Sequence, residues 1–394
     1  MTNFDDIRPY NDSEVKAVID RVVNDKEFRL AVARLQYPRI TSIIPGVVAR
    51  IVGYYVKREA RGIDSVEQLQ MIVRRYIDKM LDTTGSEVIS SGIERLDPKK
   101  SYLFVSNHRD ITLDPALLNW VLNKNQQETL RIAIGDNLLS KPYVTDLMRL
   151  NKSFIVKRSV KGNREKFKAA KHLSEYIHHS LTVDKANVWI AQREGRAKNG
   201  LDRTNTALVG MLSLNKPKTQ EFADYIRELH IVPISMSYEW DPCDGDKARE
   251  IFEHNTHGKY EKEEHEDVLT IAKGISGSKG KVRIVFGDEL TQDFNDTDEV
   301  AAEIDRQVIN NYAIQPSNYF AYKSIYGEFP PSFVDENNVA FNESDHPTEA
   351  RAFVDRLRAI EPKYRQLVRE MYANPIVSKL QLRDADHLPQ QKSA

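Results

Sequence analysis

Residues 102–115 read YLFVSNHRDITLDP and give the strongest indication of how the chain folds. The first four residues are all apolar, which is typical of a strand that is buried on both faces. A short polar loop follows and carries His108. Asp114 followed by Pro115 is a favourable helix start, with aspartate as N-cap and proline at the first helical position. The stretch therefore predicts a buried strand, a loop with a histidine, and a helix that begins at Asp114.

The same alternation of short apolar runs and helical patterns continues through the middle of the chain. Five further runs have the length and composition of strands: 131–134, 153–156, 188–191, 230–234 and 282–286. Helical patterns near 114–124, 163–181 and 203–215 separate most of them. Strands that alternate with helices predict an α/β fold with a mostly parallel sheet flanked by helices. In such a sheet the ligand usually lies beyond the carboxyl ends of the strands, where His108 falls.

Helical patterns without strands are expected on both sides of the α/β region. We place an N-terminal helical region at 1–85, the α/β domain at 86–290 and a C-terminal helical region at 291–394. The first region is expected to hold helices over 13–37, 40–55 and 65–82. The polar segment 254–281, which is rich in charge and glycine, is expected to form a loop. The tail 390–394 is expected to be disordered.

The segment 40–56 carries a long apolar stripe at the spacing of one helix face. Its members are Ile40, Ile43, Ile44, Val47, Val48, Ile51, Val52 and Tyr55. Basic residues surround it: Arg34, Arg39, Arg50, Lys57, Arg58 and Arg61. A helix lying in the surface of an anionic membrane has this pattern, and so does a helix packed on the protein core. The sequence leaves both interpretations open.

The composition argues against several classes of protein. The chain has 394 residues and a formal net charge of -1, whereas a dedicated nucleic-acid binder usually has a strong basic excess. We therefore expect no nucleic-acid partner. Cys243 is the only cysteine, so neither an intramolecular disulfide nor a cysteine-based zinc site is expected. Without a signal-peptide pattern or an apolar run of 18 residues, we expect a cytoplasmic protein, peripheral on the inner face of the membrane if 40–56 binds lipid.

His108 is the first candidate for catalysis. A reaction at a hydroxyl group requires a base for the hydroxyl proton, and imidazole has a suitable affinity for protons near neutral pH. A carboxylate on the other ring nitrogen would fix the tautomer and stabilise the imidazolium that forms, as in serine-protease triads. Asp110 and Asp114 are both close enough in sequence to serve. A purely structural role for Asp114, as a helix cap, is the alternative.

Two arginines follow predicted strands and are candidates for binding an anion. Arg158 comes after the run 153–156, and Arg196 comes after the run 188–191. Because the carboxyl ends of parallel strands meet at one edge of a sheet, both side chains could converge on one ligand. The guanidinium group offers a planar set of donors that suits phosphate. Gly195, beside Arg196, would let backbone approach such a ligand.

Four short blocks, in this order along the chain, resemble those of the glycerolipid acyltransferase superfamily, which includes glycerol-3-phosphate and lysophosphatidate acyltransferases. They are Asn107-His108 with Asp114, Lys152 to Ser159, Arg193-Glu194-Gly195-Arg196, and Ile231 to Glu239. The first block has one residue more than the family pattern between histidine and aspartate. The third has one residue fewer before its arginine. The resemblance covers roughly residues 100–290.

The resemblance implies an O-acyltransferase of phospholipid synthesis. A fatty acyl group would pass from acyl-CoA or acyl-carrier protein to glycerol-3-phosphate or 1-acylglycerol-3-phosphate, without a metal or other cofactor. It implies catalytic roles for His108 and Asp114, and substrate-binding roles for Arg158, Glu194, Gly195 and Arg196. Alignment on the helix start favours Asp114 over Asp110 as the partner of His108. The alternatives are another lyso-lipid or a hydroxylated aminolipid as acceptor, and a non-catalytic scaffold that binds lipid or CoA.

Overall fold

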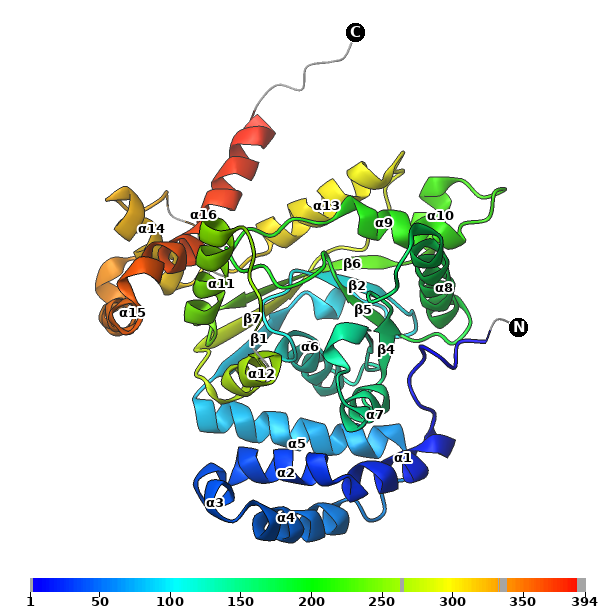
Figure 1. The fold of residues 1–394 in the computed structure, drawn as a ribbon. Helices are drawn as coiled ribbons and strands as arrows, with labels where there is room; N and C mark the ends of the chain where they lie inside the picture. Colours follow the sequence, from blue (N-terminus) through cyan, green and yellow to red (C-terminus); the bar gives the residue numbers. More distant parts are fainter. Residues whose placement is uncertain (1–2, 263–265, 332, 334–338, 388–394) are drawn as a thin grey trace.

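The computed structural model describes residues 3–262, 266–331, 333 and 339–387. At its centre is a seven-stranded sheet with the strand order β1-β7-β6-β2-β5-β3-β4 (Figure 1). The strands are β1 (Glu87–Ser91), β2 (Leu103–Ser106), β3 (Arg131–Gly135), β4 (Ser153–Val156), β5 (Val188–Ala191), β6 (Ile231–Tyr238) and β7 (Lys281–Phe286). All neighbouring strands pair in parallel except β6 and β7, which are antiparallel. The predicted α/β fold with a mostly parallel sheet is confirmed.

Helices cover both faces of the sheet, as strands with continuous apolar runs require. One face packs against α8 (Asn163–Thr182), α9 (Thr206–Leu212), α10 (Phe222–Glu228) and α13 (Thr297–Asn310). The other face packs against α5 (Val66–Thr84) and α6 (Leu113–Lys124). Alternate residues of β2 divide between the two cores, since Leu103 and Val105 enter the first and Phe104 enters the second. The loops that follow the strand ends are not covered by these two cores, and they form the candidate active site.

The strand β1 lies outside the predicted strands. It is an edge strand that pairs only with β7; its three middle residues are partly buried and its two end residues are exposed. A half-buried edge strand needs no continuous apolar run, and Glu87–Ser91 ends in two serines. The pattern that revealed the central strands is therefore missing here.

The N-terminal helices are shorter than predicted. The helix expected over 13–37 is two helices, α1 (Asp12–Asn24) and α2 (Lys26–Gln36), because the Asp25 side chain accepts a hydrogen bond from the Phe28 amide at 2.8 Å and starts a new helix. The stripe at 40–56 is likewise divided between α3 (Pro38–Ile43) and α4 (Pro45–Glu59). Each begins with proline at its first position, where the missing amide costs nothing.

The expectation of a loop over 254–281 is wrong. Helix α11 (Asp244–His257) ends inside that segment, and a further helix, α12 (Glu266–Ser276), follows within it. Charged residues on both sides of α12 hide its apolar positions in the sequence. In the fold, Ile275 packs on the core shared with α5 and α6, and Gly274 lies so close to Asp110 that a Cβ there would be 2.3 Å from the carboxylate.

The C-terminal helices form a core of their own beside the sheet. They are α14 (Pro316–Tyr326), α15 (Pro347–Ala359) and α16 (Arg365–His387). Phe320, Phe353 and Tyr372 are buried there together with Ala248 of α11, which ties this region to the α/β part.

The remaining helix, α7 (Pro142–Leu150), packs against α1. The tail 390–394 lies outside the described residues. Among the described helices, none combines the length and apolar character needed to cross a bilayer.

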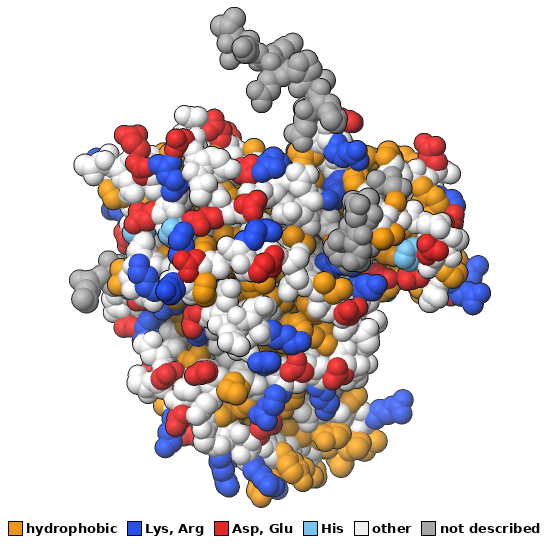
Figure 2. Space-filling model, turned by 180° about the vertical axis from the view of Figure 1, so that it is seen from behind, with side chains coloured by type: hydrophobic (Ala, Val, Ile, Leu, Met, Phe, Trp, Pro, Cys, Tyr) orange, Lys and Arg blue, Asp and Glu red, His pale blue; other side chains and the backbone are white. Residues whose placement is uncertain are grey.

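The apolar stripe has two faces in the fold. Val48 and Val52 are buried with Ala33 against α2. The other members of the stripe are exposed, with Ile43 at 80% the most exposed of them. Figure 2 shows hydrophobic side chains gathered at the lower end of the molecule, where α3 and α4 lie, with Lys and Arg side chains beside them. The stripe is therefore partly a core contact and partly an exposed surface.

Candidate active site

His108 lies in the loop that follows β2, and its ring is held by a carboxylate. The Nδ1 atom is 2.7 Å from Oδ2 of Asp114, at the start of α6. The ring meets the face of Trp189 edge-on, with 5.7 Å between ring centres. The backbone amide of Ala197 donates to the His108 carbonyl at 2.8 Å. The imidazole therefore has a fixed direction, and its side chain is still 14% exposed.

Asp114 is fully buried and bonded at both oxygens. In addition to His108, Oδ2 accepts hydrogen bonds from the amides of Arg109 at 2.6 Å and Asp110 at 3.0 Å. The hydroxyl of Tyr238, at the end of β6, donates to Oδ1 at 2.7 Å. Burial and the Asp114 charge raise the pKa of Tyr238 well above its ordinary value, so this hydroxyl keeps its proton and remains a donor. Four donors thus hold one carboxylate in a single orientation.

The helix start differs from the prediction. Helix α6 begins at Leu113, its N-cap is Thr112, and Asp114 is the second helical residue. Asp110 takes the capping function, because its Oδ1 accepts from the amides of Thr112 at 2.9 Å and Leu113 at 2.8 Å. Asp110 is also only 7% exposed, so it is not solvated; burial and the neighbouring Asp114 raise its pKa. Of the two candidate carboxylates, the structure therefore places Asp114 on the His108 ring.

A second buried polar group supports the same loop from the other side. The amide of Asn107 bonds to the backbone of Met236 on β6, accepting from its N–H at 2.8 Å and donating to its carbonyl at 2.9 Å. Asn107 also donates to Asp202 at 3.1 Å, and the Arg109 guanidinium donates to the same carboxylate oxygen at 2.5 Å. Sequence reasoning missed Asp202 and gave Tyr238 no role. Both lie more than 90 residues away from the loop that they support.

The predicted substrate-binding residues lie on two neighbouring loops but do not form one cluster. Arg158, after β4, is 3.5 Å from the carboxylate of Glu194, after β5. Gly195 has a φ of +73°, a conformation that glycine adopts without strain. Arg196 instead acts on the charge of Asp241. Burial by itself raises the pKa of Asp241, but Lys247, the Cys243 amide and, to a smaller extent, Arg196 bring it below the ordinary value. Nη1 of Arg196 is buried without a hydrogen-bond partner among the described residues.

A surface hollow lies beside Glu194. Its volume is about 520 Å³, and its lining residues are Arg193, Glu194, Arg203 and Asn205. Arg193 was named in the sequence only as part of the third block, and no role was given to Arg203, which lies farther along the chain from β5. The residues that line this hollow follow β5. Because β5 pairs with β2 in the sheet, the hollow lies in the loop that neighbours the loop of His108. The described residues include no group of three or more His, Cys, Asp or Glu side chains that could hold a metal ion.

The comparisons with known proteins identify the class of this domain. Residues 87–237 match the family model described as Acyltransferase, and this stretch contains His108, Asp114, Arg158 and the Glu194–Arg196 segment. The chain thus carries an acyltransferase domain. The domain match identifies an acyltransferase enzyme, and the four sequence blocks, which lie on strands β4 and β6 and in the loops after β2 and β5, resemble those of the glycerolipid acyltransferase superfamily.

A solved structure, described as the 1-acyl-sn-glycerophosphate (LPA) acyltransferase PlsC from Thermotoga maritima, is similar to this chain. The sequence identity is 14% and the TM-score is 0.37, over 71% of this chain and 91% of that one. Similarity at this level carries no argument about activity, so the assignment rests on the family match and the sequence blocks. No curated protein matches the chain.

Proposed function

We propose that this enzyme transfers a fatty acyl group from acyl-CoA or acyl-carrier protein to the hydroxyl of glycerol-3-phosphate or 1-acylglycerol-3-phosphate, with His108 as general base. The observation that carries the proposal is the contact of 2.7 Å between Nδ1 of His108 and the buried carboxylate of Asp114. Because a carboxylate accepts hydrogen bonds, the proton is assigned to Nδ1. That assignment leaves Nε2 free to accept a proton from the acceptor hydroxyl.

The chemistry requires no covalent enzyme intermediate. His108 Nε2 takes the proton as the acceptor oxygen attacks the thioester carbonyl carbon and forms a tetrahedral intermediate. The carbon–sulfur bond then breaks, and the imidazolium returns the proton to the leaving thiolate. Asp114 stabilises the imidazolium between the two steps, as a buried and rigidly held carboxylate can.

Recognition of the acceptor phosphate is proposed for Arg158 and for the arginines that line the hollow beside Glu194. In the free enzyme the Arg158 side chain is 36% exposed and its partner Glu194 is 72% exposed. An exposed ion pair of this kind is weak, so a phosphate dianion can replace the carboxylate. Gly195 would allow backbone amides to approach the same ligand. Arg196 fits the role less well, because it lies toward Asp241.

The surface formed by the exposed apolar side chains of α3 and α4 supports attachment to a membrane, where acceptor lipid and product reside. Segment 34–61 contains six basic residues and one acidic residue, Glu59, and all six basic side chains are exposed. An apolar face with a cationic border matches an anionic lipid surface. We therefore propose that the enzyme lies on the cytoplasmic face of the membrane through α3 and α4.

The acceptor can be identified directly. Purified enzyme would be incubated with radiolabelled acyl-CoA or acyl-carrier protein and a panel of acceptors, and products would be separated by thin-layer chromatography. The proposal predicts labelled 1-acylglycerol-3-phosphate or phosphatidate. If only a phosphate-free lyso-lipid or an aminolipid gives a labelled product, the acceptor proposed here is wrong and that lipid is the acceptor. Binding of the donor without transfer to any acceptor would contradict the catalytic proposal.

A further inference from the structure

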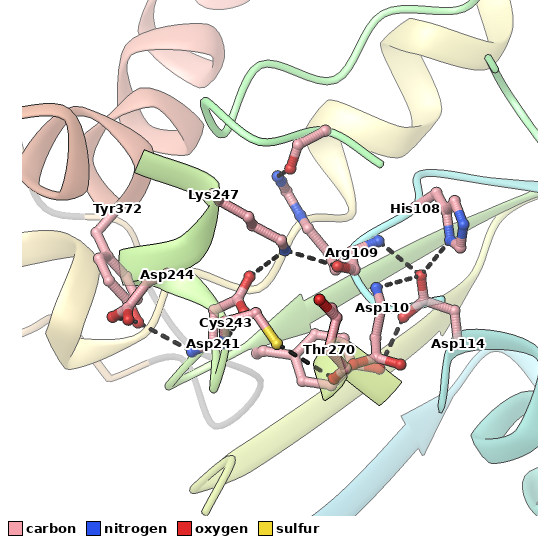
Figure 3. A network of polar contacts seen from close by, with 12 residues as sticks. His108, Arg109, Asp110, Asp114, Asp241, Cys243, Asp244, Lys247, Thr270 and Tyr372 are labelled. Atoms are coloured by element: carbon pink, nitrogen blue, oxygen red, sulfur yellow. Dashed lines mark hydrogen bonds and ion pairs between the residues drawn. The ribbon is translucent and has the colours of Figure 1, made fainter. Parts of the chain in front are cut away.

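A buried lysine contacts the backbone next to His108. Lys247 lies on α11, and its side chain is 1% exposed. Its ammonium group donates to the Arg109 carbonyl at 2.6 Å and to the carboxylate of Asp241 (Figure 3). A buried ammonium group requires partners of this kind, because it would otherwise be desolvated without compensation.

The contact completes the bonding of the turn after His108. The peptide group that joins Arg109 to Asp110 donates its N–H to Asp114 and accepts Lys247 at its carbonyl. The preceding peptide group donates the Arg109 N–H to Asp114 and accepts the Ala197 amide at the His108 carbonyl. Two consecutive peptide planes are thus bonded at both ends, which leaves the His108 backbone little freedom to rotate.

Lys247 is in turn held by the C-terminal helices. The Asp241 amide donates to the hydroxyl of Tyr372, on α16, at 2.9 Å, and that hydroxyl donates to Asp244 at 3.1 Å. Arg356, on α15, forms an ion pair with Asp244 and donates to the Asp241 carbonyl. A continuous set of buried contacts therefore runs from α15 and α16 through Asp241 and Lys247 to the loop of His108.

We propose that Lys247 is a positioning residue for His108, and that the C-terminal helices fix the catalytic loop through Tyr372, Asp241 and Lys247. The inference rests on the proposed role of His108 as base. It gives the C-terminal region, which lies outside the family match at 87–237, a direct connection with catalysis. Loss of the Lys247 contact with Arg109, or of the Tyr372 contact with Asp241, leaves a buried polar group unpaired. The His108 loop then becomes more mobile, and the His108–Asp114 hydrogen bond is weakened.

Two variants test the inference. Lys247→Met removes the ammonium group and leaves a side chain of similar volume. Tyr372→Phe removes one hydroxyl without a change of charge. Matched controls are Tyr319→Phe, whose buried hydroxyl bonds only to Phe333 among the described contacts, and Lys273→Met, which breaks a surface ion pair with Asp246. We expect kcat to fall about tenfold or more for Lys247→Met and less for Tyr372→Phe, with KM for both substrates little changed, because small displacements of a catalytic group are costly.

A spectroscopic signature separates positioning from general loss of folded protein. A ring N–H shared with a buried carboxylate gives a proton NMR resonance far downfield, and its loss in His108→Ala assigns it to this pair. The inference predicts that the resonance broadens or disappears in Lys247→Met and Tyr372→Phe, and that it persists in both controls. If Lys247→Met does not fold, Tyr372→Phe decides alone.

The outcomes distinguish this inference from the proposed function. A persistent resonance together with wild-type kcat in Tyr372→Phe and Lys247→Met would overturn the positioning role while His108→Ala remained inactive. Conversely, a resonance lost in both variants would support positioning even if His108→Ala kept its activity, and in that case the proposed function would fail instead.

Discussion

The loops that follow β2 and β5 are neighbours in the sheet, yet they differ in how much of their polar surface is already bonded. In the β2 loop, Asn107, Asp110 and Asp114 are buried and bonded within the protein. In the β5 loop, residues 193–195 are exposed, and Glu194 has one weak partner, Arg158. The comparison indicates that the enzyme fixes its base before substrate arrives and leaves its anion-binding groups free to exchange partners.

After the loss of His108 itself, the largest effect is expected from Asp114→Asn, which changes the carboxylate at the centre of the rigid loop. An asparagine can turn its oxygen toward the amides of Arg109 and Asp110 and its NH₂ toward the Tyr238 oxygen, so the fold should survive. It cannot stabilise an imidazolium by charge. We therefore expect kcat to fall by about 10²–10⁴, the usual contribution of general acid–base catalysis.

Tyr238→Phe is the matched control for that variant. It removes one donor from Asp114 but leaves the carboxylate charge and the His108 contact in place. Steady-state kinetics should show a much smaller loss than in Asp114→Asn. Equal losses in the two variants would mean that the hydrogen bonding that orients Asp114, and not its negative charge, determines the rate.

For the arginines in and around the exposed β5 loop we expect a change in KM for the acceptor. Arg158→Ala and Arg203→Ala should each raise KM for a phosphate-bearing acceptor by about tenfold or more, since a hydrogen bond to a charged group contributes about 1.5–3 kcal/mol. Lys157→Ala is the control, because the neighbouring Lys157 ammonium is bonded to Asp6 at 2.5 Å instead. Unchanged acceptor kinetics in both arginine variants would place the phosphate site elsewhere.

The same contrast explains what the sequence could predict. Local patterns revealed the strands, His108 and the arginine after β4, because strand runs and their following loops are continuous in sequence. They failed where a residue depends on distant partners. Tyr238 is 124 residues from Asp114, and nothing near Asp202 in the sequence indicates that it holds Asn107 and Arg109. The helix start was also misplaced: Asp114 was expected to cap the helix, whereas Asp110 bonds the first amides and Asp114 is the second helical residue.

A third surface, on α3 and α4, resembles the exposed loop because its apolar and basic side chains are exposed. Flotation with vesicles that contain anionic lipid should recover the native enzyme, and Ile43→Glu with Ile51→Glu should reduce binding several-fold, because charge on the apolar face opposes insertion. Val48 is unsuitable for this test, since it is buried against α2. Val354→Glu on α15, 45% exposed, is the control. Equal flotation of all three proteins would contradict attachment through α3 and α4.

The smallest effect is expected from Asp110→Asn. A carboxyl group whose pKa is raised by folding destabilises the fold when ionised, so stability falls as pH rises from 3.8 through the raised pKa. Asn keeps the capping oxygen but carries no charge beside Asp114, Lys247 and Lys279. The melting temperature of Asp110→Asn should exceed that of wild type near pH 7, by about 1 °C for each 1 kcal/mol recovered in a chain of this length.

That advantage should shrink as pH falls toward 3.8, because protonation of the wild-type carboxyl removes its charge. Asp355→Asn, at an exposed ion pair on α15, should show no such pH dependence. Activity of Asp110→Asn should stay close to wild type. A variant that is inactive at this position, together with an active Asp114→Asn, would reverse the assignment of the two carboxylates.

The central claim is that His108 removes the proton from the acceptor hydroxyl, and transfer of labelled acyl groups by His108→Ala tests it most directly. The side chain is partly exposed and its backbone is held by Asp114, Ala197 and Lys247, so the variant should retain the circular dichroism and melting temperature of the folded enzyme. We expect that acyl transfer to glycerol-3-phosphate or 1-acylglycerol-3-phosphate is lost while the donor still binds. Transfer at a rate near that of the wild-type enzyme would contradict it.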